Sequence, residues 1–327
     1  MEGAGWPGSG STMTRPELVE ASRLAIKRGS KSFSAASRLF DRTTRERVWM
    51  LYAWCRRCDD LTDAQDMGGE LGDQSDIAAK VELICSLTAK ALAGEETGDI
   101  AFDAFGQVAN EVGLTIDDAE AVIAGFQLDA EDKRPRTEAD LMRYCWHVAG
   151  AVGVMMALVM GVKREDADTL DRACDLGLAF QLANIARDVV EDDAAGRCYL
   201  PAIWLVEEDI EPGQHTKPHY RQELADMAAR LVRRMQVHAA SSRIGAARLP
   251  FRCRWAILSA ARIYTAIGRE VLAKGPAAWD HRVYTSKVQK IGHALAAFAE
   301  ALVNRPPQLD DEPRWRRSDL AENAASA

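Results

Sequence analysis

Positive charge is scarce in this chain. Its 327 residues include 41 Lys and Arg against 49 Asp and Glu, which gives a net charge of −8, and the pI is near 5.4. Domains that bind nucleic acids normally present a basic face to the phosphates. Nucleic acid is therefore excluded from the expected partners.

Long hydrophobic runs are also missing. Although 47% of the residues are hydrophobic, no stretch of 18 or more apolar residues occurs, so the sequence predicts no membrane-spanning helix. Residues 1–12 lack the basic region and apolar stretch of a secretory signal and are rich in Gly and Ser. We expect a flexible leader over 1–14, a single domain over 15–303 and a mobile tail over 304–327.

The cysteine pattern excludes a disulfide framework. Seven cysteines, an odd number, lie scattered at positions 55, 58, 85, 145, 174, 198 and 253, which favours a reducing compartment and hence a cytoplasmic location. Cys55 and Cys58 have CxxC spacing, but no second CxxC exists and the pair lies within a helical pattern. We interpret both as buried packing residues.

Alternating strand patterns are nearly absent, and almost every segment repeats its apolar residues every three or four positions. Thr137 before Glu138 is typical of a helix start. The Gly- and Pro-rich breaks are too short to mark a domain boundary. The sequence predicts an all-α bundle with helices over 17–28, 44–66, 75–93, 116–130, 138–160, 165–192, 222–240, 252–272 and 285–303.

Two of these segments are rich in small residues, at 149–153 and 176–185. Gly and Ala let another backbone or a long apolar ligand approach closely. Tight helix packing and a ligand cavity both fit the pattern, since a helical bundle builds its cavities from core positions.

Two aspartate pairs at helical spacing are the most informative feature. Asp59 and Asp63 are four residues apart, as are Asp188 and Asp192, so in a helix each pair lies on one face about 5–6 Å apart. Like charges in an apolar pattern need a cation, and a few monodentate oxygens suit Mg²⁺, which bridges carboxylates to substrate phosphates. The pattern predicts a divalent-metal diphosphate site shared between two helices. Asp60 points off this face, and we interpret it as a solvated or supporting carboxylate.

Several segments together resemble the squalene/phytoene synthase family. They are KSF at 31–33, YAWCRRCDDLTD at 52–63, YCWHVAGAVG at 144–153, LGLAFQLANIARDVVED at 176–192 and GRCYLP at 196–201. The match runs in order from about residue 20 to 300, and its joint occurrence is specific, whereas either aspartate pair alone is a weak signal. The YAWCRxCDD form is most similar to the phytoene-forming members.

The resemblance implies an isoprenoid-synthase-type helical bundle whose central cavity is lined by the two aspartate-bearing helices. It implies a prenyltransferase that condenses two prenyl diphosphates head to head through a cyclopropylcarbinyl diphosphate. In the phytoene-forming members both substrates are geranylgeranyl diphosphate, and the reaction is the first committed step of carotenoid biosynthesis. The implied cofactor is Mg²⁺, with Mn²⁺ as the alternative. No NADPH is expected, because phytoene forms by proton loss.

The resemblance also implies roles for individual residues. The expected metal ligands are Asp59, Asp63, Asp188 and Asp192, and the catalytic set adds Tyr52 and Arg56. The expected substrate-binding residues are Ser30, Phe33, Tyr144, Gln181, Asn184, Arg187, Arg197, Tyr199 and Tyr264. Arginine pairs well with phosphate oxygens, but Arg187 has a second interpretation as a structural partner of a neighbouring carboxylate.

Other functions stay open. The nearest is squalene or dehydrosqualene synthesis from farnesyl diphosphate, which differs in pocket depth and, for squalene, in the use of NADPH. Head-to-tail prenyl elongation fits DDLTD at 59–63, but the second motif lacks the paired leading aspartates of that family. A non-catalytic scaffold of the same fold is the alternative from another class, although it would not need to retain the carboxylates.

Peripheral membrane association is expected, because the implied substrate carries prenyl tails and the implied product is a hydrocarbon. Aromatic residues such as Trp204, Phe251, Trp255 and Trp279 suit either a peripheral contact or core packing, and the sequence does not choose. It also does not predict the oligomeric state.

Overall fold

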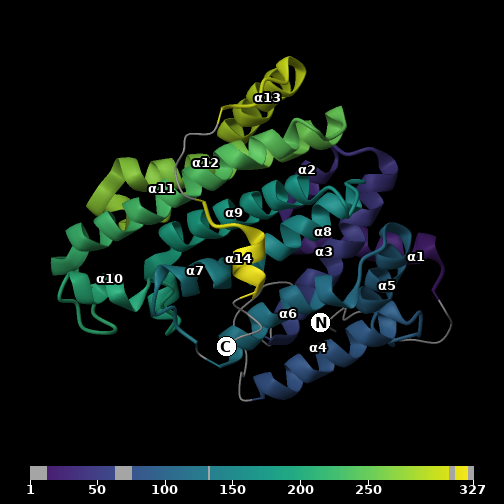
Figure 1. Ribbon diagram of the computed structural model, residues 1–327, viewed down its shortest axis with the longest axis horizontal. Helices are drawn as coiled ribbons and strands as arrows, with labels where there is room; N and C mark the ends of the chain where they lie inside the picture. Colours follow the sequence, from purple (N-terminus) through teal and green to yellow (C-terminus); the bar gives the residue numbers. More distant parts are fainter. Residues whose placement is uncertain (1–12, 63–75, 132, 309–313, 323–327) are drawn as a thin grey trace, which may run out of the picture. The chain divides into compact units, whose positions relative to one another are not determined.

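The computed structural model describes residues 13–62, 76–131, 133–308 and 314–322, and within these ranges it contains helices and no strand (Figure 1). The all-α prediction is confirmed. The chain forms two compact units, one of Met1–Glu131 with Met155–Lys163, the other of Asp132–Val154 with Arg164–Ala327. Two compact units occur both within one domain and as two domains, so the single domain over 15–303 stays a prediction.

The first unit is built around α3. Its helices are α1 (Arg15–Gly29), α2 (Lys31–Ser37), α3 (Arg42–Thr62), α4 (Ile77–Leu92), α5 (Ile100–Val112) and α6 (Ile116–Ala130). α3 packs against α1 and α5, and α4 packs against α5 and α6. Trp54 of α3 and Phe105 of α5 are fully buried and stack with ring centroids 4.4 Å apart. This packing places the apolar side chains of α3 in the core of the unit.

A half-buried charge cluster joins α1, α3 and α5 in this unit. Glu111 accepts hydrogen bonds from Arg15 Nε (2.6 Å), Arg47 Nε (2.8 Å) and Gln107 Nε2 (2.8 Å). Burial raises the pKa of Glu111, but the hydrogen bonds from the two arginines and the glutamine outweigh it and lower the pKa from 4.5 to about 2. The ionised carboxylate therefore stabilises the folded unit.

Glu111→Gln is expected to destabilise the protein by roughly 1–3 kcal/mol at neutral pH, because Arg47 loses its carboxylate partner and Arg15 keeps only Glu46. The folded-state pKa of Glu111 is below the unfolded value, so its stabilisation is present above pH 4.5 and is lost as the pH falls toward 2. The deficit of the variant in urea unfolding should shrink over this range. Glu20→Gln is the control, because its pair with Arg23 is exposed, and it should leave stability unchanged.

The second unit is built around α9 (Ala167–Ala194). Its other elements are α7 (Glu138–Cys145), η1 (Trp146–Gly150), the start of α8 (Ala151–Val159), α10 (Ala202–Glu207), η2 (Pro218–Tyr220), α11 (Arg221–Ala246), α12 (Phe251–Lys274), η3 (Gly275–Trp279), α13 (Lys287–Val303) and α14 (Arg317–Glu322). α9 packs against α7, η1, α11 and α12, and α13 packs against α12 (Figure 1). α7 begins at Glu138 as predicted, with the Thr137 side chain accepting a hydrogen bond from Asp140 N.

The α7–η1–α8 segment is the most hydrophobic part of the chain. Glu138–Val159 is long and apolar enough to cross a membrane, with a mean hydropathy of 1.3 over an 18-residue window, but 67% of that window is buried inside the protein. Such burial is typical of a core helix in a globular protein.

The small residues of this segment meet those of α9. A Cβ on Gly177 would lie 2.2 Å from the carbonyl oxygen of Ala149, and a Cβ on Gly153 would lie 2.4 Å from that of Ala173. No side chain fits between two backbones at this distance. The helix-packing interpretation of these small residues is therefore confirmed for Gly153 and Gly177.

Gly177→Ala is expected to cost roughly 3 kcal/mol, because the new methyl group meets rigid backbone rather than a side chain that can move. Thermal unfolding of the purified variant measures this. Gly292→Ala in α13 is the matched control: nothing lies within 4 Å of its Cβ position, so it should stabilise the helix by roughly 0.5–1 kcal/mol. Equal melting temperatures for the two variants would contradict the close contact.

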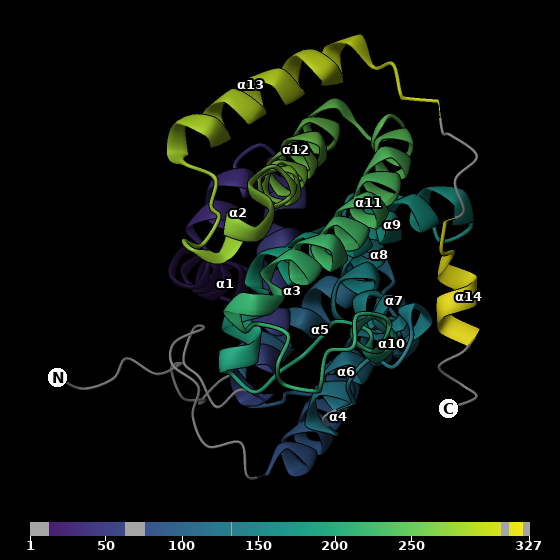
Figure 2. The same cartoon turned by 90° about the vertical axis from the view of Figure 1, so that its left-hand side faces the viewer.

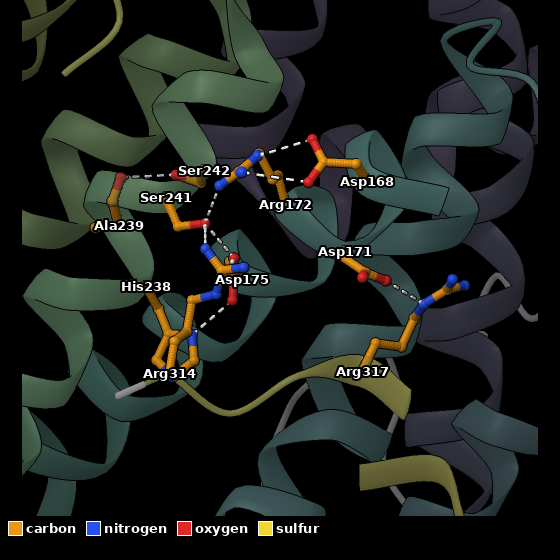
Figure 3. Close-up of polar contacts among 10 residues, drawn as sticks. All are labelled: Asp168, Asp171, Arg172, Asp175, His238, Ala239, Ser241, Ser242, Arg314 and Arg317. Atoms are coloured by element: carbon orange, nitrogen blue, oxygen red, sulfur yellow. Dashed lines mark hydrogen bonds and ion pairs between the residues drawn. The ribbon is translucent and has the colours of Figure 1, made fainter. Parts of the chain in front are cut away.

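The C-terminal segment is tied to α9 and α11 by a polar network (Figure 3). Arg317 Nε donates to Asp171 (2.8 Å), and Arg314 Nε lies 3.4 Å from Asp175. Asp175 is only 2% exposed and also accepts from Ser241 and bonds to His238 Nδ1 (2.7 Å). Within the predicted tail over 304–327, residues 314–322 therefore have fixed partners, and the remaining positions beyond 308 lie outside the described residues.

Candidate active site

The second aspartate motif occupies the last turns of α9. Asp188 and Asp192 lie one turn apart on this helix, with Gln181 and Asn184 on preceding turns of the same stripe, both half-buried. The carboxyl end of a helix carries the negative end of its dipole, which favours a bound cation. Two carboxylates at this end therefore make a strongly cation-attracting position.

Asp188 has two arginine partners. Arg187 Nε donates to it at 2.7 Å, and Arg282 Nη2, from the segment between η3 and α13, donates at 2.9 Å. The second interpretation of Arg187, as a structural partner of a neighbouring carboxylate, is therefore confirmed. Arg282 was missed by the sequence analysis, because it lies 94 residues from Asp188 and belongs to no recognisable motif. Its segment is held by Trp279, whose Nε1 donates to the Ala186 carbonyl (3.2 Å).

Asp192 is the carboxylate of the pair whose ionised form is destabilised. Burial and the nearby charge of Asp188 raise its pKa to about 7, against a partial opposing effect of Arg197. Asp192, Arg197 and His215 line the same narrow crevice. Because this pKa is close to neutral pH, the carboxyl is only partly ionised there, and a further cation nearby would favour its ionised form.

Beside this crevice, Asp193 and His215 form a contact that the sequence analysis did not foresee. Thr216 Oγ1 donates to Asp193, and His215 Nε2 lies 3.9 Å from the same carboxylate. His215 is 1% exposed, and neither ring nitrogen has a hydrogen-bond partner among the described residues. Burial lowers the pKa of His215, which favours the neutral ring.

Aromatic pairs surround the second motif. Tyr144 of α7 stacks on Tyr199, which follows α9, with ring centroids 4.8 Å apart. Tyr264 of α12 stacks on Phe180 of α9 at 4.0 Å. The structure thus places Tyr144, Tyr199 and Tyr264, all expected in the site, in ring contacts with other aromatic residues.

The first aspartate motif occupies the end of α3. Arg56 Nη1 lies 3.3 Å from Asp59, whose side chain is half exposed. Asp63 lies outside the described residues. Asp60 is 3% exposed, which contradicts the solvated alternative because its off-face position points into the core, whereas the supporting-carboxylate alternative stays a prediction.

Two polar groups of this motif, the Tyr52 hydroxyl and the Arg56 guanidinium, lie next to each other in a largely buried position. Burial raises the pKa of Tyr52 and Arg56 partly offsets this, but neither the hydroxyl nor Arg56 Nε makes a hydrogen bond of standard geometry among the described residues. The absence of a side chain at Gly29 makes room for the Tyr52 hydroxyl, since a Cβ at Gly29 would lie 2.6 Å from it. Buried donors normally have partners, so this position fits an anionic ligand.

The short helix α2 borders the same position. Ser30 caps it by accepting a hydrogen bond from Phe33 N (3.2 Å), and the Phe33 ring is 6.2 Å from Tyr52 and 43% exposed. Ser30, Phe33, Tyr52 and Arg56 are therefore brought together as expected, although the hydroxyl of Ser30 already has a structural role.

The donor set fits a hydrated divalent cation rather than a closed metal site. Across the described residues, no three His, Cys, Asp or Glu side chains gather as a metal site. Each motif offers carboxylates at i, i+4 spacing, which suits Mg²⁺ that keeps waters and completes its shell with phosphate oxygens. Within the second unit, the raised pKa of Asp192 fits a nearby cation. Within the first unit, the buried Tyr52 hydroxyl and Arg56 Nε near Asp59 fit an anionic ligand.

Comparison with known proteins shows similarity along nearly the whole chain. The phytoene synthase of Pseudescherichia vulneris is 43% identical over 93% of this chain and 99% of its own length. The 15-cis-phytoene synthase of Pantoea ananas is 44% identical, again over 93% of this chain and 99% of its own length. Full-length coverage at this identity extends the similarity well beyond the motifs.

The fold agrees as well. The crystal structure of a dehydrosqualene synthase in complex with a ligand has a TM-score of 0.78 at 25% sequence identity, covering 88% of this chain and 98% of that one. The isoprenoid-synthase fold expected from the sequence is confirmed. The model of the family described as squalene/phytoene synthase matches residues 26–289. The chain therefore belongs to the squalene/phytoene synthase family.

Proposed function

We propose that this protein is a 15-cis-phytoene synthase, which condenses two molecules of geranylgeranyl diphosphate to prephytoene diphosphate and then to phytoene. The observation that carries this proposal is the 44% identity to a 15-cis-phytoene synthase along nearly its whole length. In the first step one diphosphate leaves, C1 of that molecule bonds to the double bond of the second, and a proton is lost as the cyclopropane closes. In the second step the remaining diphosphate leaves, the ring opens to join the two C1 carbons, and loss of another proton gives phytoene.

We assign the residues of both motifs the following roles in these steps. Asp188 and Asp192, and Asp59 with Asp63, would hold the Mg²⁺ ions. Bound Mg²⁺ would neutralise the charge of the departing diphosphate. Arg56 and Tyr52 supply hydrogen-bond donors to diphosphate oxygens. The stacked aromatic rings of Tyr144 and Tyr264 exclude water from the carbocations and present faces that attract positive charge.

A product assay tests the proposal. Purified protein is incubated with Mg²⁺ and either geranylgeranyl or farnesyl diphosphate, each with and without NADPH. A forty-carbon hydrocarbon from geranylgeranyl diphosphate, independent of NADPH, is the expected result. A thirty-carbon product from farnesyl diphosphate would instead assign squalene or dehydrosqualene synthesis, the second candidate, which the similarity to a dehydrosqualene synthase structure favours. No hydrocarbon from either substrate would contradict both.

The proposal also covers the cellular location of the enzyme. Prenyl diphosphates carry long apolar tails and phytoene is a hydrocarbon without a polar group, so both partition into membranes. We propose a cytoplasmic enzyme in peripheral contact with a bilayer, from which it takes substrate and to which it delivers product.

A further inference from the structure

The outer side of α13 is apolar where a surface helix is normally polar. Its side chains Val288, Ile291, Leu295, Phe298 and Leu302 are 79%, 62%, 65%, 37% and 62% exposed. These positions follow a spacing of three and four residues, so they form one stripe along the helix. The 17 residues of α13 make this stripe about 25 Å long. We call these five residues the α13 outer face.

The inner side of α13 is held by polar contacts. Trp255 Nε1 donates to the Ala294 carbonyl (2.8 Å), and Arg254 Nη1 donates to the Ala301 carbonyl (2.9 Å). Glu300 accepts from Arg243 (3.0 Å) and Arg262 (2.8 Å). Figure 2 shows α13 lying across α12, with no described helix of this unit on its far side. The helix is thus fixed in place with its apolar stripe directed outward.

Further aromatic residues extend the outer face at both ends. The Phe298 ring meets Phe251 of α12 edge to face at 5.6 Å, and Phe251 is 36% exposed. Tyr284, just before α13, is 78% exposed. Trp204 and Trp279, which the sequence left open as membrane contacts, are only 2% and 8% exposed and belong to the core.

The segment that carries the outer face has a charge opposite in sign to that of the chain. Residues 251–305 contain nine Lys and Arg and three Asp and Glu, whereas the whole chain has a net charge of −8. Lys287 begins α13 and Arg305 follows its end, Arg252 is next to Phe251 in α12, and all three are exposed. An amphipathic helix with an apolar face and basic borders is typical of an interfacial membrane helix.

We propose that the α13 outer face is the surface by which this protein seats on an anionic lipid bilayer, with the five apolar side chains in the acyl boundary and the basic border residues at the headgroups. The proposal rests on the proposed function, which gives the enzyme an apolar substrate tail and a hydrocarbon product. It also places the bilayer near the chemistry, because the segment that leads into α13 carries Arg282, which is bonded to Asp188.

A second copy of the chain fits the α13 outer face less well than a bilayer does. A stable dimer needs about 800 Å² from each partner, supplied by about 20–30 residues, and the outer face with its two aromatic extensions has seven side chains. Pairing two such faces would also bring their basic borders together. An anionic bilayer meets the same borders with opposite charge.

Vesicle flotation of the full-length protein tests the proposal without substrate. Wild type is expected to float with phosphatidylcholine–phosphatidylglycerol vesicles and to remain unbound with phosphatidylcholine alone. The double variant I291E/L295E should partition at least about 10-fold less, since charges in the apolar face oppose insertion. Val206→Glu is the matched control, because Val206 is 71% exposed on α10 and lies outside the outer face, and it should float like wild type.

Several results would overturn the proposal. The proposal is contradicted directly if the wild-type protein does not bind anionic vesicles, or if the double variant floats as well as the wild type. Sedimentation showing a wild-type dimer that becomes a monomer in the double variant, without vesicle binding, would assign the face to a second copy. If the double variant unfolds, K287E/R305E replaces it and should weaken flotation several-fold. Phytoene formation in detergent is measured separately: its absence in wild type refutes the proposed function, whereas its retention in a variant that no longer floats supports the lipid surface.

Discussion

Asp188→Asn is expected to lower kcat for phytoene formation about 10³-fold or more, because Mg²⁺ loses a charged oxygen ligand at the position where the diphosphate departs. The substitution preserves side-chain size, so the circular dichroism spectrum should be unchanged. The Mg²⁺ concentration for half-maximal residual activity should rise, which separates lost metal binding from lost substrate binding. Steady-state assays with geranylgeranyl diphosphate over a Mg²⁺ series measure both quantities.

Asp168→Asn provides the matched control for this variant. Asp168 lies on the same helix and is also held by two arginines, Arg172 (3.2 Å) and Arg248, but it is far along α9 from the motif. Its loss should leave kcat and the Mg²⁺ requirement within about threefold of wild type, as for exposed ion pairs in general. Near-normal activity of Asp188→Asn, or an equal defect in both variants, would refute the metal-site assignment.

Arg56→Lys is expected to lower kcat about 10²-fold, the usual cost of removing a preorganised donor aimed at developing negative charge. Arg56 is half-buried beside the Tyr52 hydroxyl, and its Nε makes no hydrogen bond of standard geometry among the described residues. A lysine keeps the charge but cannot reproduce the planar fork that pairs with two phosphate oxygens. Single-turnover rates at saturating substrate isolate this effect from substrate binding.

The neighbouring arginine serves as the comparison. Arg57 lies on another side of α3, where its Nε donates to Asp99 (2.7 Å), a residue at the start of α5. Arg57→Lys should reduce thermal stability slightly and leave kcat close to wild type. If both substitutions reduced kcat equally, the role of Arg56 would be structural rather than a contact to the diphosphate.

Local patterns in the sequence were sufficient for the class of fold and for the family. Apolar residues repeating every three or four positions predicted helices that the structure confirms, and Thr137 correctly marked the start of α7. Helical hydrogen bonds join residues four apart, so this information is contained in short segments. The same local spacing placed Asp188 and Asp192 one turn apart on α9.

The sequence was less reliable about burial, because helical spacing says which residues share a face but not what that face meets. The sequence left Asp60 open between a solvated and a supporting carboxylate, and Trp204 and Trp279 between a membrane contact and core packing, and all three side chains are buried. The small residues at 149–153 had two interpretations, and contacts with α9 decided for backbone packing. Each of these outcomes depends on a second helix.

By itself, the sequence determined the all-α class, most of the long helices, the two carboxylate motifs and the family, because these follow from residue spacing within single segments, although it missed α5. Only the tertiary structure decided that Arg282 pairs with Asp188 across 94 residues, that Arg314 and Arg317 bind the carboxylates of α9, and that α13 directs its apolar stripe outward. Such contacts join segments far apart in the chain and arise only when packing brings the helices together, so no local pattern encodes them.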